Sequence, residues 1–416
     1  MIHMRLLSSR YSLSTGIGLT ALAMAVAVAV IQRQQHAAEI ERMESAVPLT
    51  DLSAAPYNEL EVRDRDIELY SRRIVEDPSS AVDRLTLARL LFTRSRINGS
   101  TADLDRAEAL ARESIAERTQ RNYPAFELLA SLLMAQHEFR EARAVALRAD
   151  SLNPGSSSQL ALLGEIELEL GDYNAAATHF EAVNYDGRNF TTGARVARWY
   201  ELTGQIGKAR QFLKRAIVAV DRRDDLPREQ VAWFHYRLGE LELRAGNIDA
   251  ADSAFLIGLK RHPDDVRVLG GLSRASLARG AWQQAIDFGE RATAIQLDPA
   301  TLGTISRAYA QLGDTAQARS YARAMSVSAL DQPGVIHRAW GLFLLDHGTA
   351  QDRAHVLQRA RRELRDRKDV YGHDLMAWAL YRDGQLEAAR NEMRLALARN
   401  TEDVMLSEHA RAIGVW

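Results

Sequence analysis

The residues that could support metal binding or nucleophilic catalysis do not occur at the spacings that such chemistry needs. The chain of 416 residues contains 11 histidines and no cysteine, so it has no thiolate to act as nucleophile or zinc ligand. Two histidines that bind one metal from the same helix lie about one turn apart, and no two histidines here are three or four residues apart. We therefore predict neither a metal site nor a bound cofactor.

Two short motifs look like catalytic loops but lack their defining residues. In residues 204–208 (GQIGK), two residues separate the glycines and Ala209 follows the lysine, whereas a phosphate-binding loop has four intervening residues and then serine or threonine. Residues 271–275 (GLSRA) come near to a nucleophile elbow, but that motif requires a strand before its serine, and Ser273 falls in a predicted helix. We therefore predict no catalytic residues and a protein that is not an enzyme.

The overall composition is that of a folded, largely helical protein. Hydrophobic residues make up 46% of the chain, charged residues 26%, and prolines number only nine. The formal net charge is −2, whereas nucleic-acid-binding domains usually carry a strong positive excess. We therefore predict no nucleic-acid partner.

The N-terminal part of the chain has the pattern of a membrane-targeting segment. Residues 11–32 carry no charge, and residues 16–31 (GIGLTALAMAVAVAVI) are almost wholly apolar, a length sufficient to span a bilayer as a helix. Arg5 and Arg10 precede the segment, so its N-terminal side should remain cytoplasmic. We therefore expect a cytoplasmic region at 1–11, a transmembrane anchor or signal peptide at 12–32 and a linker at 33–56.

Two interpretations of this segment remain open. A cleaved signal peptide would release the protein into the periplasm, but small-residue sites such as 25–27 (AVA) lie inside the apolar run rather than after it. An uncleaved anchor would hold the rest of the protein on the periplasmic side of the membrane, and we favour it.

Glycines at regular spacing organise the remainder of the chain. The intervals between them lie between 33 and 42 residues, and His137 occupies the equivalent place one interval earlier; the glycines are Gly171, Gly204, Gly246, Gly280, Gly313, Gly348 and Gly384. Seven residues before each turn stands a small residue, as at Ala130, Gly164 and Gly239. A turn glycine and a small packing residue are what two closely packed antiparallel helices require.

The repeated segments resemble the tetratricopeptide repeat family. The resemblance is carried by residues 162–180 (LLGEIELELGDYNAAATHF), 235–255 and 373–393, with closing prolines such as Pro263. It implies an all-α fold, a right-handed superhelical solenoid over residues 57–413. We expect a half-repeat near 59–77, nine hairpins starting near 81, 123, 157, 190, 232, 266, 299, 334 and 370, and a capping helix near 403–413.

Two repeats depart from the pattern. Residues 94–105 (RSRINGSTADLD) contain an Asn-Gly-Ser-Thr run that predicts a loop. Residues 221–230 (DRRDDLPREQ) lengthen one interval to 42 residues and either form a tolerated loop or mark a joint between two stacked blocks.

The resemblance also implies a groove lined by the first helix of each hairpin. The residue after each small packing position should face it, at Arg89, Ser131, Glu165, Arg198, Glu240, Arg274, Arg307, Leu342 and Trp378. Tyr236 and Arg338 lie one turn earlier on the same face, and Tyr381 and Arg382 one turn later. Arginine occupies four of the nine positions, and guanidinium groups suit carboxylates.

We therefore hypothesise that Arg274, Arg307 and Arg338 form a basic stripe that engages acidic side chains or a C-terminal carboxylate of a protein partner. In the alternative interpretation, these arginines pair with acidic residues on neighbouring helices. The predicted function is a non-enzymatic scaffold for protein–protein interaction, tethered at the cell envelope. The alternatives are a structural subunit of an envelope assembly or secretion complex and, less favoured, a small-molecule binder or an enzyme.

Overall fold

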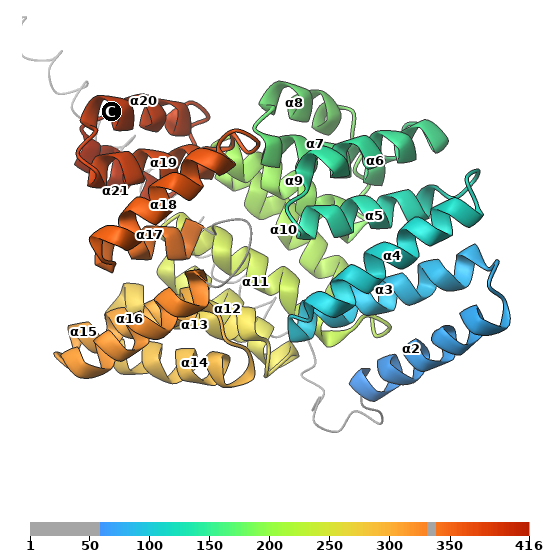
Figure 1. The fold of residues 1–416 in the computed structure, drawn as a ribbon, viewed down its shortest axis with the longest axis horizontal. Helices are drawn as coiled ribbons and strands as arrows, with labels where there is room; N and C mark the ends of the chain where they lie inside the picture. The colour runs from blue at the N-terminus through green and yellow to red at the C-terminus, as the bar shows by residue number, and fades with distance from the viewer. Residues whose placement is uncertain (1–58, 331–337, 416) are drawn as a thin grey trace, which may run out of the picture. The chain divides into compact units, whose positions relative to one another are not determined.

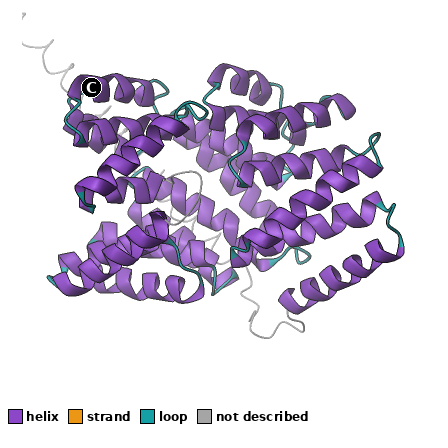
Figure 2. Cartoon of the chain, in the orientation of Figure 1, coloured by secondary structure: helices purple, strands orange, loops and turns teal. Residues whose placement is uncertain are grey.

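The computed structural model describes residues 59–330 and 338–415, and within these ranges the chain consists of helices, turns and short loops without a strand (Figures 1 and 2). The chain divides into two compact units, residues 1–55 and 56–416, and every described residue belongs to the second. The all-helical repeat architecture that the turn spacing predicts is confirmed.

The described helices pair as successive antiparallel hairpins. A single helix, α2 (Glu59–Glu76), precedes them, and α21 (Val404–Ile413) follows them. The first helices of the hairpins are α3 (Ala81–Asn98), α5 (Tyr123–Ala135), α7 (Ser157–Leu170), α9 (Phe190–Leu202), α11 (Arg228–Arg244), α13 (Val266–Arg279), α15 (Pro299–Gln311), α17 (Arg338–His347) and α19 (Val370–Arg382). The second helices are α4 (Thr101–Glu117), α6 (Phe139–Leu152), α8 (Tyr173–Glu181), α10 (Ile206–Asp221), α12 (Ile248–Arg261), α14 (Trp282–Ile295), α16 (Thr315–Leu330), α18 (Ala350–Glu363) and α20 (Leu386–Leu397).

The turns within the hairpins explain the periodic glycines. Gly171, Gly280 and Gly384 adopt φ angles of +80°, +83° and +81°, a left-handed conformation that closes the end of a helix and that other residues rarely adopt. His137, at the equivalent place in the α5–α6 turn, adopts the same conformation with φ at +64°. The turn therefore imposes the conformation even where glycine is absent, although Gly348, in the α17–α18 turn, is an exception and lacks a positive φ.

The small packing residues allow the two helices of a hairpin to approach closely. A Cβ atom added to Gly164 would lie 2.6 Å from the ring of Phe180, and one added to Gly239 would lie 2.4 Å from the ring of Phe255. Ala130, Ala197 and Ala377 are buried at the equivalent positions. In the hairpins α7–α8 and α11–α12, the core is therefore an aromatic side chain of the second helix packed onto a glycine of the first.

The two irregular repeats retain the hairpin arrangement. Most of 94–105 is helical, because Gly99 ends α3 with φ at +69° and Ser100 caps α4 by accepting a hydrogen bond from Asp103 N. The predicted loop is therefore reduced to two residues. At 221–230, α10 and α11 share one hydrophobic cluster, in which Val220 and Ile217 pack with Val231 and Phe234. The longer exit loop thus does not interrupt the core there.

The predicted regions at 1–11, 12–32 and 33–56 lie outside the described residues. Within the two described ranges, no helix combines the length and apolar character that crossing a membrane requires.

Candidate functional site

Acidic and basic residues on the first helices pair from one hairpin to the next. Arg195 on α9 donates from Nε to Glu165 on α7 at 2.7 Å. Arg274 on α13 forms an ion pair with Glu240 on α11 in the same manner. We call these two ion pairs, together with the ion pairs of Glu201 with Arg198, Arg237 and Arg244, the inner ladder.

Glu201 at the end of α9 is the most heavily paired carboxylate of the inner ladder. It is 3% exposed and lies 3.1 Å from Arg198, 3.1 Å from Arg237 and 2.7 Å from Arg244. Burial by itself would raise the pKa of Glu201, but the three guanidinium groups outweigh that effect and hold the pKa well below its usual value. A carboxylate in this setting stays ionised at neutral pH and fixes the arginines around it.

Glu240 on α11 continues the inner ladder toward α13. It is 8% exposed, and burial alone would raise its pKa, whereas Arg274 and Arg244 lower it overall. Tyr236, one turn earlier, packs its ring 6.0 Å from that of Phe255, and its burial raises the pKa of its hydroxyl. Both groups therefore form part of the packed structure rather than an open surface.

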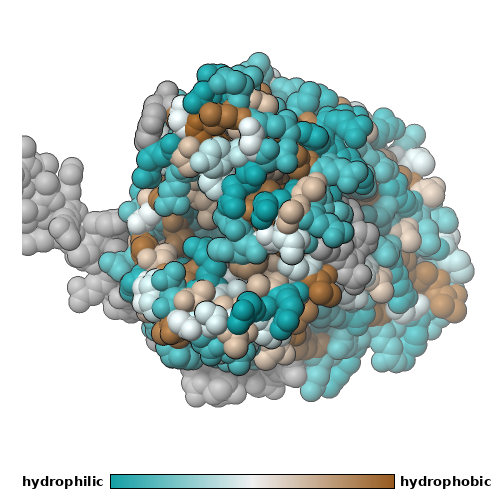
Figure 3. Space-filling view, turned by 60° about the vertical axis from the view of Figure 1, so that its left-hand side comes forward, coloured by the Kyte–Doolittle hydropathy of each residue, from teal (hydrophilic) through white to brown (hydrophobic). Residues whose placement is uncertain are grey.

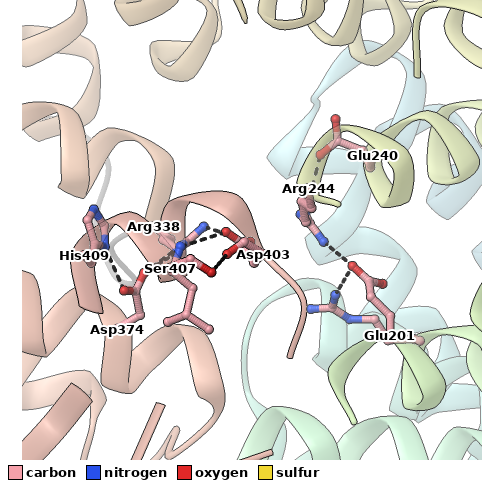
Figure 4. Close-up of polar contacts among 10 residues, drawn as sticks. Glu201, Glu240, Arg244, Arg338, Asp374, Asp403, Ser407 and His409 are labelled. Carbon is pink, nitrogen blue, oxygen red and sulfur yellow. Dashed lines mark hydrogen bonds and ion pairs between the residues drawn. The ribbon is translucent and has the colours of Figure 1, made fainter. Parts of the chain in front are cut away.

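A second polar cluster joins the helices α17 and α19 to the C-terminal helix α21. Arg338 on α17 donates from Nε to Asp374 on α19 at 2.8 Å, and its Nη1 lies 3.8 Å from Asp403. Asp374 is fully buried, and its other oxygen lies 2.7 Å from His409 Nδ1 on α21. Burial favours the neutral form of Asp374, yet Arg338 and His409 lower its pKa overall. Figure 4 shows both this cluster and the pairing of Glu201, Arg244 and Glu240.

The ring of Tyr371 connects the second cluster to the inner ladder. It is 7% exposed, and the guanidinium carbons of Arg198, Arg244 and Arg338 lie 5.5, 5.5 and 4.6 Å from its centre. Guanidinium groups are attracted to an aromatic face at such distances. Because these residues come from α9, α11, α17 and α19, the face on which a groove was expected is closed here by the chain's own C-terminal helices.

One part of the predicted surface stays accessible, and we call it the C-terminal patch; it consists of Arg307, Asp346, His347, Trp378, Tyr381 and Arg382. Trp378 stacks on His409 at 4.2 Å between ring centres and on Tyr381 at 5.1 Å. Its Nε1 donates to Asp346 at 2.9 Å, and Asp346 also pairs with Arg382. Trp378 and Tyr381 remain half-buried rather than enclosed.

Arg307 is exposed on α15 and forms no ion pair with any residue of 59–330 or 338–415. The charge of Arg307 affects the pKa of His347. Partial burial lowers that pKa, Arg307 and Arg382 lower it further, and Asp346 opposes them. Arg307 and Arg382 thus act on the same histidine, and for that reason we count Arg307 with the C-terminal patch.

The nine predicted site residues thus divide into two groups. Arg198, Glu240, Arg274 and Arg338 are engaged in ion pairs and Tyr236 is packed, so for Arg274 and Arg338 the alternative of pairing with neighbouring acidic residues describes the structure. Arg307, Trp378, Tyr381 and Arg382 lie together in the C-terminal patch. The sequence analysis did not identify Glu201, Arg244, Tyr371, Asp374 and His409. The spacing of Glu201 and Arg237, an acidic and a basic residue about one repeat apart, could have indicated their ion pair.

The described residues offer little to an ion or a small molecule in this region. Within them, no group of three or more histidine, aspartate or glutamate side chains is placed to hold a metal ion. A cavity lined by Arg338 and Tyr371 has a volume of about 20 Å³, which is room for about one water molecule.

Comparison with known proteins supports the repeat assignment. Residues 127–189 and 236–300 match the family model described as Tetratricopeptide repeat, and these stretches cover much of α5 to α8 and α11 to α14. No curated protein is similar enough in sequence to this chain to count as a relative.

Among solved structures, the fold is similar to that of a chain in the APC/C hetero-tetramer Cut9-Hcn1, with a TM-score of 0.52 at 16% identity. The match covers 85% of this chain and 59% of that one, so this chain spans a little over half of the other's length. The human IFIT1 dimer with PPP-AAAA gives a TM-score of 0.45 at 13% identity, covering 83% of this chain and 96% of that one. PilW, described as a widely conserved type IV pilus biogenesis factor, gives 0.43 at 15% identity, covering 51% and 96%. At such identities the likeness concerns the fold alone.

Proposed function

We propose that this tetratricopeptide-repeat protein is a non-enzymatic scaffold that binds a protein or peptide partner at its C-terminal patch. Repeat solenoids present extended surfaces whose side chains come from successive repeats, and such surfaces recognise other chains. The C-terminal patch has this character, because Arg307, Trp378 and Arg382 are contributed by two different hairpins. Tryptophan, tyrosine and arginine are also the residues that contribute most to binding at protein interfaces.

The proposal rests on two features, Arg307, which has no ion pair with the described residues 59–330 and 338–415, and the half-buried aromatic stack of Trp378 and Tyr381. The other two arginines of the predicted stripe are neutralised by Glu240 and Asp374. Arg382, in turn, is paired with Asp346. We therefore propose an acidic partner segment, with carboxylates facing the arginines and an apolar side chain against Trp378 and Tyr381. Hydrophobic residues are scattered over a mainly hydrophilic face in Figure 3, which fits polar recognition better than a broad apolar interface.

The test compares two arginine variants of the full-length protein in affinity capture from its native membrane. Arg307→Ala should reduce recovery of the partner several-fold, and the remaining binding should respond less to added salt because one exposed charge pair is lost. The matched control is Arg323→Ala, which removes an exposed arginine from α16, the second helix of the same hairpin. Equal recovery with both variants would refute binding at the C-terminal patch. A complex that keeps fixed stoichiometry in high salt would instead favour a permanent structural subunit.

We also propose that residues 12–32 anchor the protein in a membrane with the repeats on the periplasmic side. The support comes from the sequence, in which 22 uncharged residues follow Arg5 and Arg10. Protease added to intact spheroplasts should degrade the repeats, and the protein should remain with membranes after alkaline washing. An N-terminus of the mature protein beyond residue 25, together with loss from the membrane, would show that the segment is a cleaved signal peptide.

A further inference from the structure

The turns of three consecutive hairpins each meet a segment of the C-terminal helices. A Cβ atom added to Gly171 would lie 2.2 Å from the carbonyl oxygen of Lys368, and one added to Gly204 would lie 2.3 Å from that of Asn400. A Cβ added to Gly246, in the next turn, would lie 3.1 Å from Val404. Two of these contacts are too close for any side chain, so the turn glycines serve contact with distant backbone as well as the turn itself.

Hydrogen bonds reinforce the contact at each of the first two turns. Lys368 N donates to Leu170 O at 3.3 Å, and Val370 N donates to the Tyr173 hydroxyl at 3.0 Å. The Thr401 hydroxyl donates to Leu202 O at 2.6 Å and is buried. These bonds satisfy backbone groups at the ends of α7 and α9, which have no partner within their own helix.

Ion pairs and guanidinium–ring contacts also lie in this interface. Arg367 lies 2.9 Å from Glu169, and Tyr371 contacts Arg198 and Arg244 as described above. Tyr173 and Leu202 add an apolar part, since they pack with residues of α19 to α21 in one hydrophobic cluster. Within the hairpins α3–α4 and α5–α6, by contrast, buried leucines and alanines form one hydrophobic cluster. An interface rich in charged groups recovers hydration when it separates, so it opens at lower cost than an apolar core.

We infer that helices α18 to α21 form an intramolecular clasp, which closes over the first-helix face of α7, α9 and α11 and which releases as a unit. Release exposes the side of Arg198 and Arg244 that faces the ring of Tyr371, while both arginines remain paired with Glu201 and Arg244 also with Glu240. The closed clasp thus hides one set of arginines while the C-terminal patch remains accessible. This inference concerns a conformational change of the chain alone and holds independently of what binds at the patch.

The test measures hydrogen–deuterium exchange in full-length variants in which a turn glycine is replaced by alanine. We call a variant a wedge variant when the added methyl group would overlap a clasp residue. Gly204→Ala places a methyl group where the Asn400 carbonyl lies, and Gly171→Ala does the same against Lys368. The matched control is Gly313→Ala in the α15–α16 turn, which has φ at +82° and no atom within 4 Å of the added Cβ. It carries the same backbone strain without the wedge.

We expect either wedge variant to exchange at least about tenfold faster than Gly313→Ala, with the increase confined to amides near the C-terminal ends of α7 and α9 and to α19 and α21. Thr401→Val, which removes a single clasp hydrogen bond, should produce a smaller increase in the same segments. The inference is overturned if the wedge variants exchange like the control. It is also overturned if their faster exchange extends evenly through α3 to α6 and α13 to α16, because the clasp would then not release separately from global unfolding.

Discussion

Arg274 on α13 and Glu240 on α11 form an ion pair across 34 positions of the sequence, close to the length of one repeat. Both residues occupy the position that was expected to face a partner, and each neutralises the other instead. Opposite charges at equivalent positions meet here, whereas Glu165 and Arg198, which also stand at equivalent positions, pair with Arg195 and Glu201 instead. The pairing therefore ties the packing of one hairpin to the next and leaves few free charges on that face.

Replacing Glu201 by glutamine should destabilise the protein strongly. The change removes the negative charge that Arg198, Arg237 and Arg244 share, and it leaves three partly buried guanidinium groups to repel one another. Breaking a buried ion pair from one side costs about 3 kcal/mol, and we expect a loss of that order in the free energy of unfolding, measured with urea. Glu61→Gln, in an exposed pair with Arg65, is the control and should change stability by less than about 0.5 kcal/mol.

Two glycine-to-alanine substitutions should change stability in opposite directions. Gly239→Ala introduces a methyl group against Phe255 and should cost about 1–3 kcal/mol through overpacking. Gly207→Ala, in α10, meets no atom within 4 Å and should stabilise by up to about 1 kcal/mol because alanine favours the helix. Thermal unfolding of the two variants beside the wild type measures both effects. Equal effects would contradict the assignment of Gly239 as a packing residue.

The repeat architecture was predictable because its signals are local. The turn at Gly280 requires a positive φ, and the contact of Gly239 with Phe255 requires a small residue; each such demand recurs once per repeat and becomes visible in the sequence. The loop expected from the Asn-Gly-Ser-Thr run within 94–105 is present but short, because Gly99 ends α3 and Ser100 caps α4. The residues on either side of these two continue the helices.

The candidate site was only partly predictable, because its contacts depend on helices far apart in the sequence. The face that carries Arg338 and Trp378 follows from helix periodicity and the family resemblance. That Arg338 is buried against Asp374, whereas Arg307 remains exposed, depends on how α17, α19 and α21 come together. Nothing in the local sequence around Tyr371 indicates that arginines from α9 and α11 will surround its ring.

Truncating Trp378 to alanine should impair both stability and partner capture. The indole stacks on His409 and Tyr381 and donates to Asp346, so its loss should cost about 1–2 kcal/mol in the free energy of unfolding for a half-buried aromatic. Capture of the partner from the native membrane should fall by more than stability explains. Trp282→Ala removes another half-buried tryptophan, from the second helix α14, and should destabilise without reducing capture. If the two variants capture the partner equally, Trp378 serves packing alone.

Acid should destabilise the protein through the buried carboxylates of the inner ladder and the second cluster. The pKa values of Glu201, Glu240 and Asp374 are all lowered in the folded state by neighbouring arginines, despite the opposing effect of burial. A carboxyl group with a lowered folded pKa contributes its full stabilisation above its unfolded pKa, about 4.3 for glutamate and 3.9 for aspartate. That contribution disappears as the pH falls through the folded pKa.

The contribution of these groups to the free energy of unfolding should therefore stay nearly constant between pH 7 and about 5. It should decrease steeply below about pH 4. Asp369, Glu127 and Glu167 act in the opposite sense, because burial raises their folded pKa values. The pKa values of Glu242, Asp265 and Asp103 are lowered, and these groups add to the acid-sensitive set. Urea titrations at a series of pH values measure the slope, which should be shallower in Glu201→Gln because that variant has lost one of the acid-sensitive carboxylates. A slope unchanged by this substitution would mean that Glu201 is not held ionised by its arginines.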